Sequence, residues 1–173
     1  NIHIIGGGNL GVAIALGFAN YTIGNQITIT RRNVSQIKHL EANGITVSSD
    51  NTLNIQQADL IILTIKPYQV DLVLNEILPH LSNKIIASAV SGLAMETLEQ
   101  KTNAAHAIVR IMPNIAAQFA ESATCISFSE KNKVAGEQVI KLFNQIGTAL
   151  VIEEKLMDAA TVLGACGTAY ALR

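Results

Sequence analysis

The sequence has few charged residues, few cysteines and no run of like charge. Charged residues make up 14% of the 173 residues, and 12 Lys and Arg nearly balance 13 Asp and Glu, for a formal net charge of −1. A protein that binds nucleic acid or an anionic membrane surface needs clustered Lys and Arg. The two cysteines, Cys125 and Cys166, are too few for a disulfide framework. We therefore expect a cytoplasmic protein with no nucleic-acid or membrane partner.

Long apolar runs are also missing. No stretch reaches the roughly 20 apolar residues that cross a membrane, and Gly6, Gly7 and Gly8 interrupt the N-terminal segment before a signal peptide could form. The four histidines lack the spacing of metal ligands, so no metal site is expected. In contrast, 49% of the residues are hydrophobic, which suits a well-filled core.

Short apolar runs alternate with helical patterns, as is typical of a parallel α/β sheet. Strands are expected at residues 2–5, 26–30, 45–47, 59–65, 84–89, 107–111, 123–128 and 149–152. Helices are expected at residues 9–19, 34–43, 67–78, 95–101 and 133–146, the second ended by Gly44 in a left-handed cap. The pattern predicts a Rossmann-type, doubly wound, mostly parallel sheet over residues 1–153, with helical segments following from about residue 155.

The first expected strand runs directly into Gly6-x-Gly8-x-x-Gly11. In a dinucleotide-binding turn the first glycine permits the tight turn, the second lets the backbone approach the pyrophosphate, and the third lets the helix pack closely on the sheet. Amides at the helix start, near Asn9, then face the phosphates. The alternative is an incidental glycine-rich turn, but the position between a strand and a helix favours a dinucleotide site.

The end of the second strand bears on which dinucleotide is bound. An NAD site usually has Asp or Glu there, which binds the ribose 2′-hydroxyl. This chain has Thr30-Arg31-Arg32, and two guanidinium groups suit a 2′-phosphate. The sequence predicts NADP(H) as the preferred cofactor and NAD(H) as the second choice. If Arg31 and Arg32 are only solvated residues, the preference is weak.

Later strand ends carry compact polar turns. The central strand ends Thr64-Ile65-Lys66-Pro67 and a later one ends with residues 110–114. Ligands of open α/β sheets bind at the carboxyl ends of strands. Lys66 is thus placed to reach a ribose hydroxyl or a substrate carboxylate, unless it is simply a polar loop residue before a proline.

Taken in order, these blocks resemble the Δ1-pyrroline-5-carboxylate reductase family. The matching blocks are Ile5-Gly6-Gly7-Gly8-Asn9-Leu10, Arg31-Arg32, Asp59 with Ile65-Lys66-Pro67, Ser91-Gly92, Arg110-Ile111-Met112-Pro113-Asn114 and Gly167-Thr168-Ala169-Tyr170. The resemblance implies an NAD(P)H-dependent oxidoreductase of proline biosynthesis, which reduces the C–N double bond of a cyclic imine to give L-proline.

The resemblance also implies roles for individual residues. Asn51 matches a position near the adenosine, residues 65–67 the loop at the nicotinamide ribose, and residues 112–114 the turn beneath the reacting ring. The expected cofactor-binding residues are Gly6, Gly8, Asn9, Leu10, Gly11, Thr30, Arg31, Arg32, Asn51, Ile65, Lys66, Pro67, Met112, Pro113 and Asn114. No catalytic residue is certain, although Lys66 and the loop of Cys166 are expected near the reacting centre.

Two departures from the family pattern bear on the substrate more than on the cofactor. Ile115-Ala116 stands where the family commonly has Thr-Pro. Cys166 stands where the family has a serine that would contact substrate or nicotinamide, and Thr168 replaces a proline. We expect Cys166 to be a small buried residue rather than a nucleophile, because no His partner is evident.

In the family, a helical C-terminal domain holds the substrate carboxylate and forms the dimer. The resemblance therefore implies that residues 154–173 begin such a domain, that this chain is truncated within it and lacks half of its active site, and that the protein is a homodimer or higher homo-oligomer. The alternatives are another reductase of this architecture (F420-dependent NADP reductase, β-hydroxyacid or prephenate dehydrogenase) or a non-catalytic NADP-binding relative.

Overall fold

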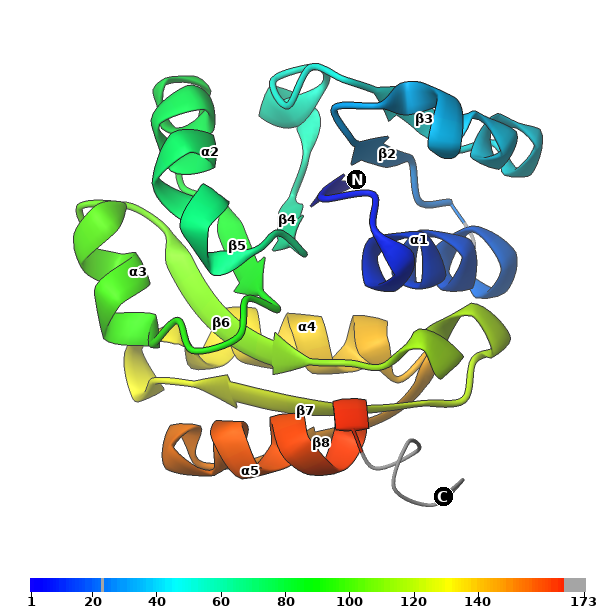
Figure 1. Cartoon of the computed structure of the whole chain (residues 1–173). Helices are drawn as coiled ribbons and strands as arrows, with labels where there is room; N and C mark the ends of the chain where they lie inside the picture. Colours follow the sequence, from blue (N-terminus) through cyan, green and yellow to red (C-terminus); the bar gives the residue numbers. More distant parts are fainter. Residues whose placement is uncertain (23, 167–173) are drawn as a thin grey trace.

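The computed structural model describes residues 1–22 and 24–166, and an eight-stranded sheet in the order β3-β2-β1-β4-β5-β6-β7-β8 forms its centre (Figure 1). The strands are β1 Ile2–Ile5, β2 Ile27–Thr30, β3 Thr46–Ser48, β4 Leu60–Leu63, β5 Ile85–Ser88, β6 Ala107–Met112, β7 Ser122–Phe128 and β8 Gly147–Val151. Each overlaps an expected strand, with ends shifted by no more than two residues. The order of the first six strands is that of a Rossmann fold, so the prediction of a Rossmann-type, mostly parallel sheet is confirmed.

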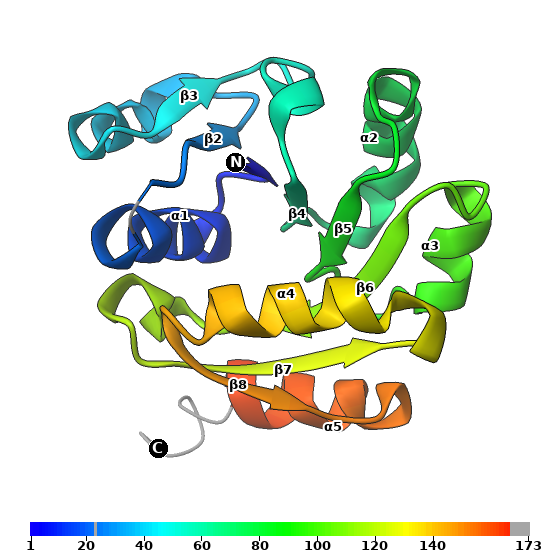
Figure 2. The ribbon, with the colours of Figure 1, turned by 180° about the vertical axis from the view of Figure 1, so that it is seen from behind.

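The central strands are apolar throughout because helices cover both faces of the sheet. All residues of β1 and β4 are buried, as expected for parallel strands between two helical layers. Helices α1 (Asn9–Tyr21) and α4 (Lys133–Phe143) cover one face, where the rings of Phe18 and Phe143 meet edge to face with centroids 5.4 Å apart. Figure 2 shows α4 lying across β6 and β7.

The opposite face carries α2 (Val70–Ile77) and α3 (Met95–Lys101), which pack through a second apolar cluster. Helix α5 (Met157–Thr161) follows β8 and packs against β6 and β7. It is followed by a π-helical turn, Val162–Cys166.

The last two strands run against the rest. β7 pairs antiparallel with β6, whereas β8 pairs parallel with β7. The chain from β6 to β7 contains only the short 3₁₀ helix Ile115–Phe119, which is too short for the crossover that a parallel pair requires.

Several expected helices are shorter or tighter than predicted. The helix expected at residues 34–43 is wrong as a single α-helix: two 3₁₀ segments, Val34–Gln36 and Lys38–Asn43, meet at Ile37, whose side chain is fully buried. Gly44 does end the second one in the left-handed region, with φ 74°. The helix expected at residues 67–78 starts with the 3₁₀ turn Pro67–Gln69 and ends as an α-helix at Ile77.

The helix expected at residues 133–146 also ends early, at Phe143. The Asn144 side chain accepts a hydrogen bond from the Ala149 backbone amide at 2.8 Å. This contact turns the chain toward β8.

A buried arginine holds the segment after β8 against the sheet. Arg110 of β6 is 6% exposed, and its guanidinium donates to Glu154 at 3.4 Å and to Asp158 at 3.1 Å. Glu154 also accepts the backbone amide of Met95, the first residue of α3, at 2.7 Å. The segment that begins at Glu154 is therefore tied to both β6 and α3. Whether residues 154–173 begin a separate domain stays a prediction.

Candidate dinucleotide-binding site

The glycine turn joins β1 to α1 as the sequence predicts. The Gly6 and Gly7 amides donate to the Thr30 carbonyl at 3.1 and 2.8 Å, which ties the turn to the end of β2. Gly6 has φ 114°, a backbone conformation that side chains disfavour. A Cβ on Gly11 would lie 2.1 Å from the Gly6 carbonyl oxygen. The fold itself thus requires glycine at both positions.

Gly8 differs from these two glycines. Its φ is −80°, which any residue can adopt, and a Cβ built on it meets no atom within 4 Å. Within the described part of the chain, no contact requires glycine there. The open space lies where α1 begins, and among the described residues no protein acceptor faces the amides of Asn9, Leu10 and Gly11. Both features are those expected of a turn that a diphosphate approaches closely.

Two side chains brace the turn from neighbouring strands. The Thr64 hydroxyl, just beyond β4, donates to the Gly6 carbonyl at 2.7 Å. Arg31, just beyond β2, donates from Nη1 to the Gly7 carbonyl. Arg31 is half-buried against the turn whereas Arg32 is exposed. The sequence predicts the same role for both arginines, but the structure distinguishes them. Arg31 supports the turn, whereas the Arg32 guanidinium has no protein partner in the described part of the chain.

A cleft of about 740 Å³ opens above the turn, between the carboxyl ends of β1 and β4. This is the point where the strand order reverses, since β2 and β3 lie on one side of β1 and β4 to β8 on the other. Open α/β sheets bind their ligands at such a switch point. A smaller hollow of about 350 Å³ adjoins the cleft at Gly8 and Arg31 and reaches Asn9 and Ile115.

Most predicted residues from the first half of the chain line the cleft. These are Gly6, Gly8, Thr30, Arg31, Arg32, Asn51, Ile65 and Lys66. Asn9 lies in the adjoining hollow. Leu10, Gly11 and Pro67 belong to the same turns but line neither space.

The residues expected beneath the reacting ring are not brought into the cleft. Met112 and Pro113 are buried at the end of β6. The Asn114 side chain caps the 3₁₀ helix that follows, accepting the Ala116 amide at 3.0 Å. The side chain of Cys166 and the whole of residues 167–170 lie outside the part of the chain that can be described. Their roles stay predictions.

Asn51 lines the cleft and is held by two side-chain hydrogen bonds. Its Oδ1 accepts the Thr30 hydroxyl at 2.6 Å, and its Nδ2 donates to Glu76 Oε2 at 2.8 Å. These bonds set the orientation of the amide and join β2 to α2 across the cleft.

Other lining residues were not predicted as site residues. They are Ile5, Gly7, Asn33, Gln36, Ser49, Thr64, Tyr68, Gln69, Leu72, Val73 and Glu76. Tyr68, Leu72 and Glu76 come from the helical segment after β4 rather than from a strand end, so strand-end motifs do not indicate them. Their four-residue spacing, offset from the buried positions of α2, is the signal that could have found them.

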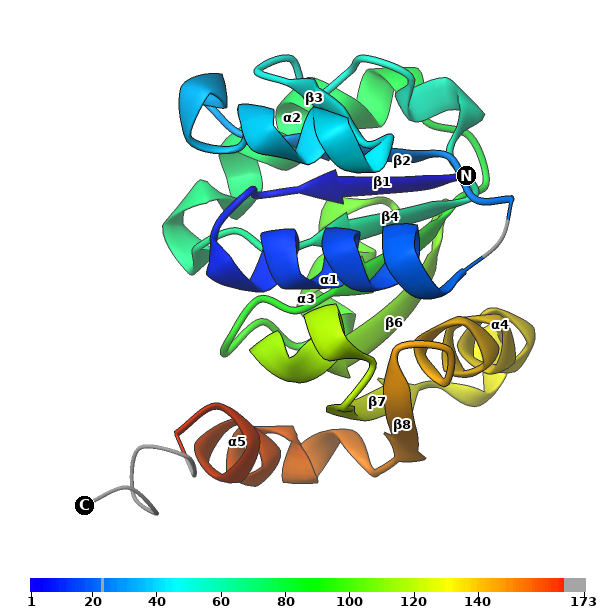
Figure 3. The same ribbon diagram turned by 90° about the vertical axis from the view of Figure 1, so that its right-hand side faces the viewer.

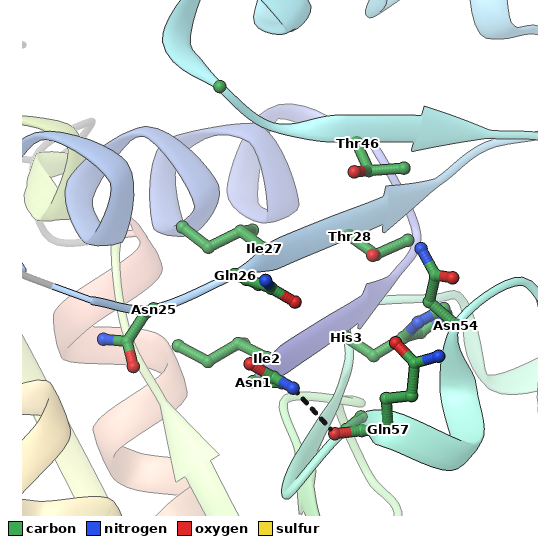
Figure 4. A pocket seen from close by; sticks show the side chains of 12 residues that line it. Asn1, Ile2, His3, Asn25, Gln26, Ile27, Thr28, Thr46, Asn54 and Gln57 are labelled. Atoms are coloured by element: carbon green, nitrogen blue, oxygen red, sulfur yellow. Dashed lines mark hydrogen bonds between the residues drawn. The ribbon is translucent and has the colours of Figure 1, made fainter.

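A second pocket, of about 360 Å³, lies at the amino ends of β1 and β2 (Figure 4). His3 lines it, is 1% exposed, and has no hydrogen-bond partner for either ring nitrogen in the described part. Burial lowers the pKa of His3 to about 4, so the ring is neutral at physiological pH. Among the described residues that line it there is no Gly-x-Gly turn and no Lys or Arg side chain to hold a dinucleotide.

Residues 1–22 and 24–166 contain no group of three His, Cys, Asp or Glu side chains that could hold a metal ion. In the same ranges, no helix combines the length and apolar character needed to span a membrane.

Known proteins resemble this chain in sequence. Residues 1–92 match the model of a family described as "NADP oxidoreductase coenzyme F420-dependent". The chain is 35% identical to pyrroline-5-carboxylate reductase 2 of Dictyostelium discoideum, covering 100% of this chain and 64% of that protein. It is 33% identical to pyrroline-5-carboxylate reductase of Methanosarcina acetivorans, covering 98% of this chain and 64% of that protein. The chain thus spans slightly less than two thirds of the length of these relatives.

Solved structures of pyrroline-5-carboxylate reductases also resemble this chain. A pyrroline carboxylate reductase of Plasmodium falciparum with NADP bound superimposes with a TM-score of 0.82 at 28% identity, covering 99% of this chain and 64% of that one. A pyrroline-5-carboxylate reductase of Coxiella burnetii gives a TM-score of 0.88 at 26% identity, covering 99% and 66%. The resemblance to pyrroline-5-carboxylate reductases is confirmed.

Proposed function

We propose that this chain, a member of the family described as NADP oxidoreductase coenzyme F420-dependent, is the NADP(H)-binding part of a pyrroline-5-carboxylate reductase. The whole protein would reduce Δ1-pyrroline-5-carboxylate to L-proline with NADPH. The observation that carries the proposal is Gly8: it faces open space at the start of α1, beside a β2 end that bears Arg31 and Arg32 and no acid.

The residues present fit the cofactor. The amides at the start of α1 would hold the diphosphate, Arg32 the 2′-phosphate, and Ile65 with Lys66 the nicotinamide ribose. When bound, the nicotinamide supplies the hydride for the reduction. The chain contributes position: Thr64 and Arg31 fix the turn, and the turn fixes the direction in which the dinucleotide extends along the cleft.

A cyclic imine protonated on nitrogen is already electrophilic, so its reduction needs little acid–base assistance from the protein. This agrees with a cleft in which, among the described residues, the lining groups that titrate are Lys66, Tyr68, Glu76 and the two arginines. Lys66, exposed at the end of β4, would bind the ribose or the substrate carboxylate rather than move a proton.

The finer features of the proposal are as follows. NADPH is preferred and NADH is also used. The protein is cytoplasmic and forms a homodimer or higher homo-oligomer through a helical C-terminal domain, of which residues 154–173 are the start and which also binds the substrate.

The test is the oxidation of NADPH by the purified full-length protein in the presence of pyrroline-5-carboxylate, with the reduction of NADP⁺ by 3-hydroxybutyrate as the control for a hydroxyacid dehydrogenase. Turnover of the imine alone is expected. Binding of NADP⁺ without turnover of any substrate would instead indicate a non-catalytic NADP-binding protein. The absence of NADP⁺ binding would overturn the proposal itself.

The family description favours one alternative, an F420-dependent NADP reductase. The match covers residues 1–92, which hold the glycine turn and most of the cleft, so it bears on the cofactor more than on the substrate. The relatives that match almost the whole chain favour the imine. Adding reduced F420 and NADP⁺ to the same assay separates the two.

A further inference from the structure

Glu76 places a carboxylate on the cleft that the proposed function does not yet use. It projects from α2, whose buried positions are Val70, Val73, Leu74 and Ile77. Tyr68, Leu72 and Glu76 recur at four-residue intervals and all line the cleft, as expected of one helix face. The cleft therefore has one wall, here called the α2 wall, formed by Tyr68 of the 3₁₀ turn Pro67–Gln69 and by Leu72 and Glu76 of α2.

The Glu76 carboxylate is held in a defined orientation. Asn51 Nδ2 donates to its Oε2 at 2.8 Å, and Asn51 is itself fixed by the Thr30 hydroxyl at 2.6 Å. Within residues 1–22 and 24–166, Glu76 forms no ion pair, and its Oε1 receives no hydrogen bond. One carboxylate oxygen is thus anchored from β2 while the other remains able to accept.

Charge and polarity differ between the two walls. Arg31 and Arg32 stand at the end of β2, so phosphate groups belong on that side. On the α2 wall, Tyr68 is 81% exposed and Leu72 is 72% exposed. Two exposed apolar side chains beside an oriented carboxylate suit a flat ring that carries an N–H donor at its edge, and they do not suit a phosphate.

We propose that Glu76 is a specificity-determining residue that selects the adenine base of the dinucleotide by accepting a hydrogen bond from its exocyclic amino group. The ring would lie against Tyr68 and Leu72. This inference rests on the proposed function, because it takes the bound molecule to be NADP(H). A base with an oxygen at the same place would set an acceptor against the carboxylate, and such a mismatch is rejected more strongly than a missing apolar contact.

The test compares NADP⁺ with nicotinamide hypoxanthine dinucleotide phosphate, in which oxygen replaces the amino group. Binding is measured by calorimetry with the purified protein and no substrate. The wild type is expected to bind NADP⁺ about tenfold to a hundredfold more tightly, the range for a hydrogen bond to a charged group. In Glu76→Gln the amide oxygen can keep the Asn51 contact and the amide nitrogen can donate to hypoxanthine. The ratio is then expected to fall to about one or to invert.

Asp71→Asn is the matched control. Asp71 lies on the same helix, pairs with Lys101 and does not line the cleft, so the ratio is expected to stay at the wild-type value. Equal binding of both dinucleotides by the wild type, or an unchanged ratio in Glu76→Gln, would overturn the proposal while leaving the proposed function intact. If neither dinucleotide binds, both fall. Because the wild-type ratio is measured on the unmodified protein, misfolding of Glu76→Gln does not remove the test.

Discussion

Replacing Gly8 by alanine separates the requirements of the cofactor from those of the fold. A Cβ at this position meets no protein atom within 4 Å, and the backbone φ of −80° suits alanine. The lower flexibility of the unfolded chain favours the variant by about 0.4–1 kcal/mol. Alanine is a poorer N-cap than glycine, which costs a similar amount. The free energy of unfolding should therefore change by less than about 1 kcal/mol.

Binding should respond differently, because the new methyl group occupies the space where the diphosphate approaches the backbone. Saturation of the wild type with NADP⁺ at about 100 times Kd stabilises it by about 2.7 kcal/mol. For a chain of this size that corresponds to a rise of roughly 5–10 °C in the unfolding temperature. In Gly8→Ala we expect an unfolding temperature close to that of the wild type and no rise with NADP⁺.

Gly11→Ala is the contrasting variant. Its Cβ would lie 2.1 Å from the Gly6 carbonyl oxygen, so we expect a loss of about 2–3 kcal/mol in stability even without ligand. Thermal unfolding of the three proteins, each with and without NADP⁺, is the assay. A Gly8→Ala protein that NADP⁺ stabilises as strongly as it does the wild type would refute the inference that Gly8 serves the ligand.

Three further predictions concern single side chains. Arg32→Ala should weaken the binding of NADP⁺ about tenfold or more and leave the binding of NAD⁺ unchanged. Arg31→Ala should weaken the binding of both dinucleotides, because the Gly7 carbonyl loses its hydrogen-bond donor. Calorimetry that finds equal losses of affinity for the two dinucleotides in Arg32→Ala would contradict this prediction. The pKa of His3 is about 4 in the folded protein against 6.5 for a free histidine. Between pH 6.5 and pH 4, His3 therefore binds a proton in the unfolded chain but not in the folded one. The free energy of unfolding should fall by up to about 3 kcal/mol as the pH drops through this range. Urea unfolding should show a flatter pH dependence for His3→Leu, and an unchanged slope would count against the assignment. Arg110→Met should lower the free energy of unfolding by about 1–3 kcal/mol because it leaves the Glu154 carboxylate without its partner. Lys131→Ala, which breaks an exposed ion pair, should lower it by less than about 1 kcal/mol. Similar losses for the two variants in urea unfolding would contradict the stronger contribution of the Arg110 contacts.

The strands and the glycine turn could be predicted because their signals are local. A buried parallel strand is a short apolar run, and the turn into α1 needs glycine at fixed spacing whatever the rest of the chain does. Local signals did not predict residues 34–43 correctly. Their apolar spacing is that of one α-helix, but the burial of Ile37 in the core divides the segment into two 3₁₀ helices.

The cleft was predicted only in part because its walls come from different kinds of element. Strand ends carry recognisable motifs, and these indicated Arg32 and Lys66. Glu76 sits in a helix, and its place in the cleft depends on which face of α2 packs on the sheet. The different roles of Arg31 and Arg32 depend on the hydrogen bond from Arg31 to the Gly7 carbonyl, 24 residues away in the sequence. No local pattern indicates such a contact.

The reversal of β7 and β8 has a consequence for where the chain travels next. A wholly parallel sheet ends each strand at the cofactor edge, so the following helix must carry the chain away from the ligand. Because β8 points the other way, it ends at the far edge, and α5 brings the chain back toward the edge where α1 begins (Figure 3). The pair of Arg110 with Glu154 fixes the start of this return path. Strand direction thus decides which residues lie near the edge of the sheet that carries the glycine turn.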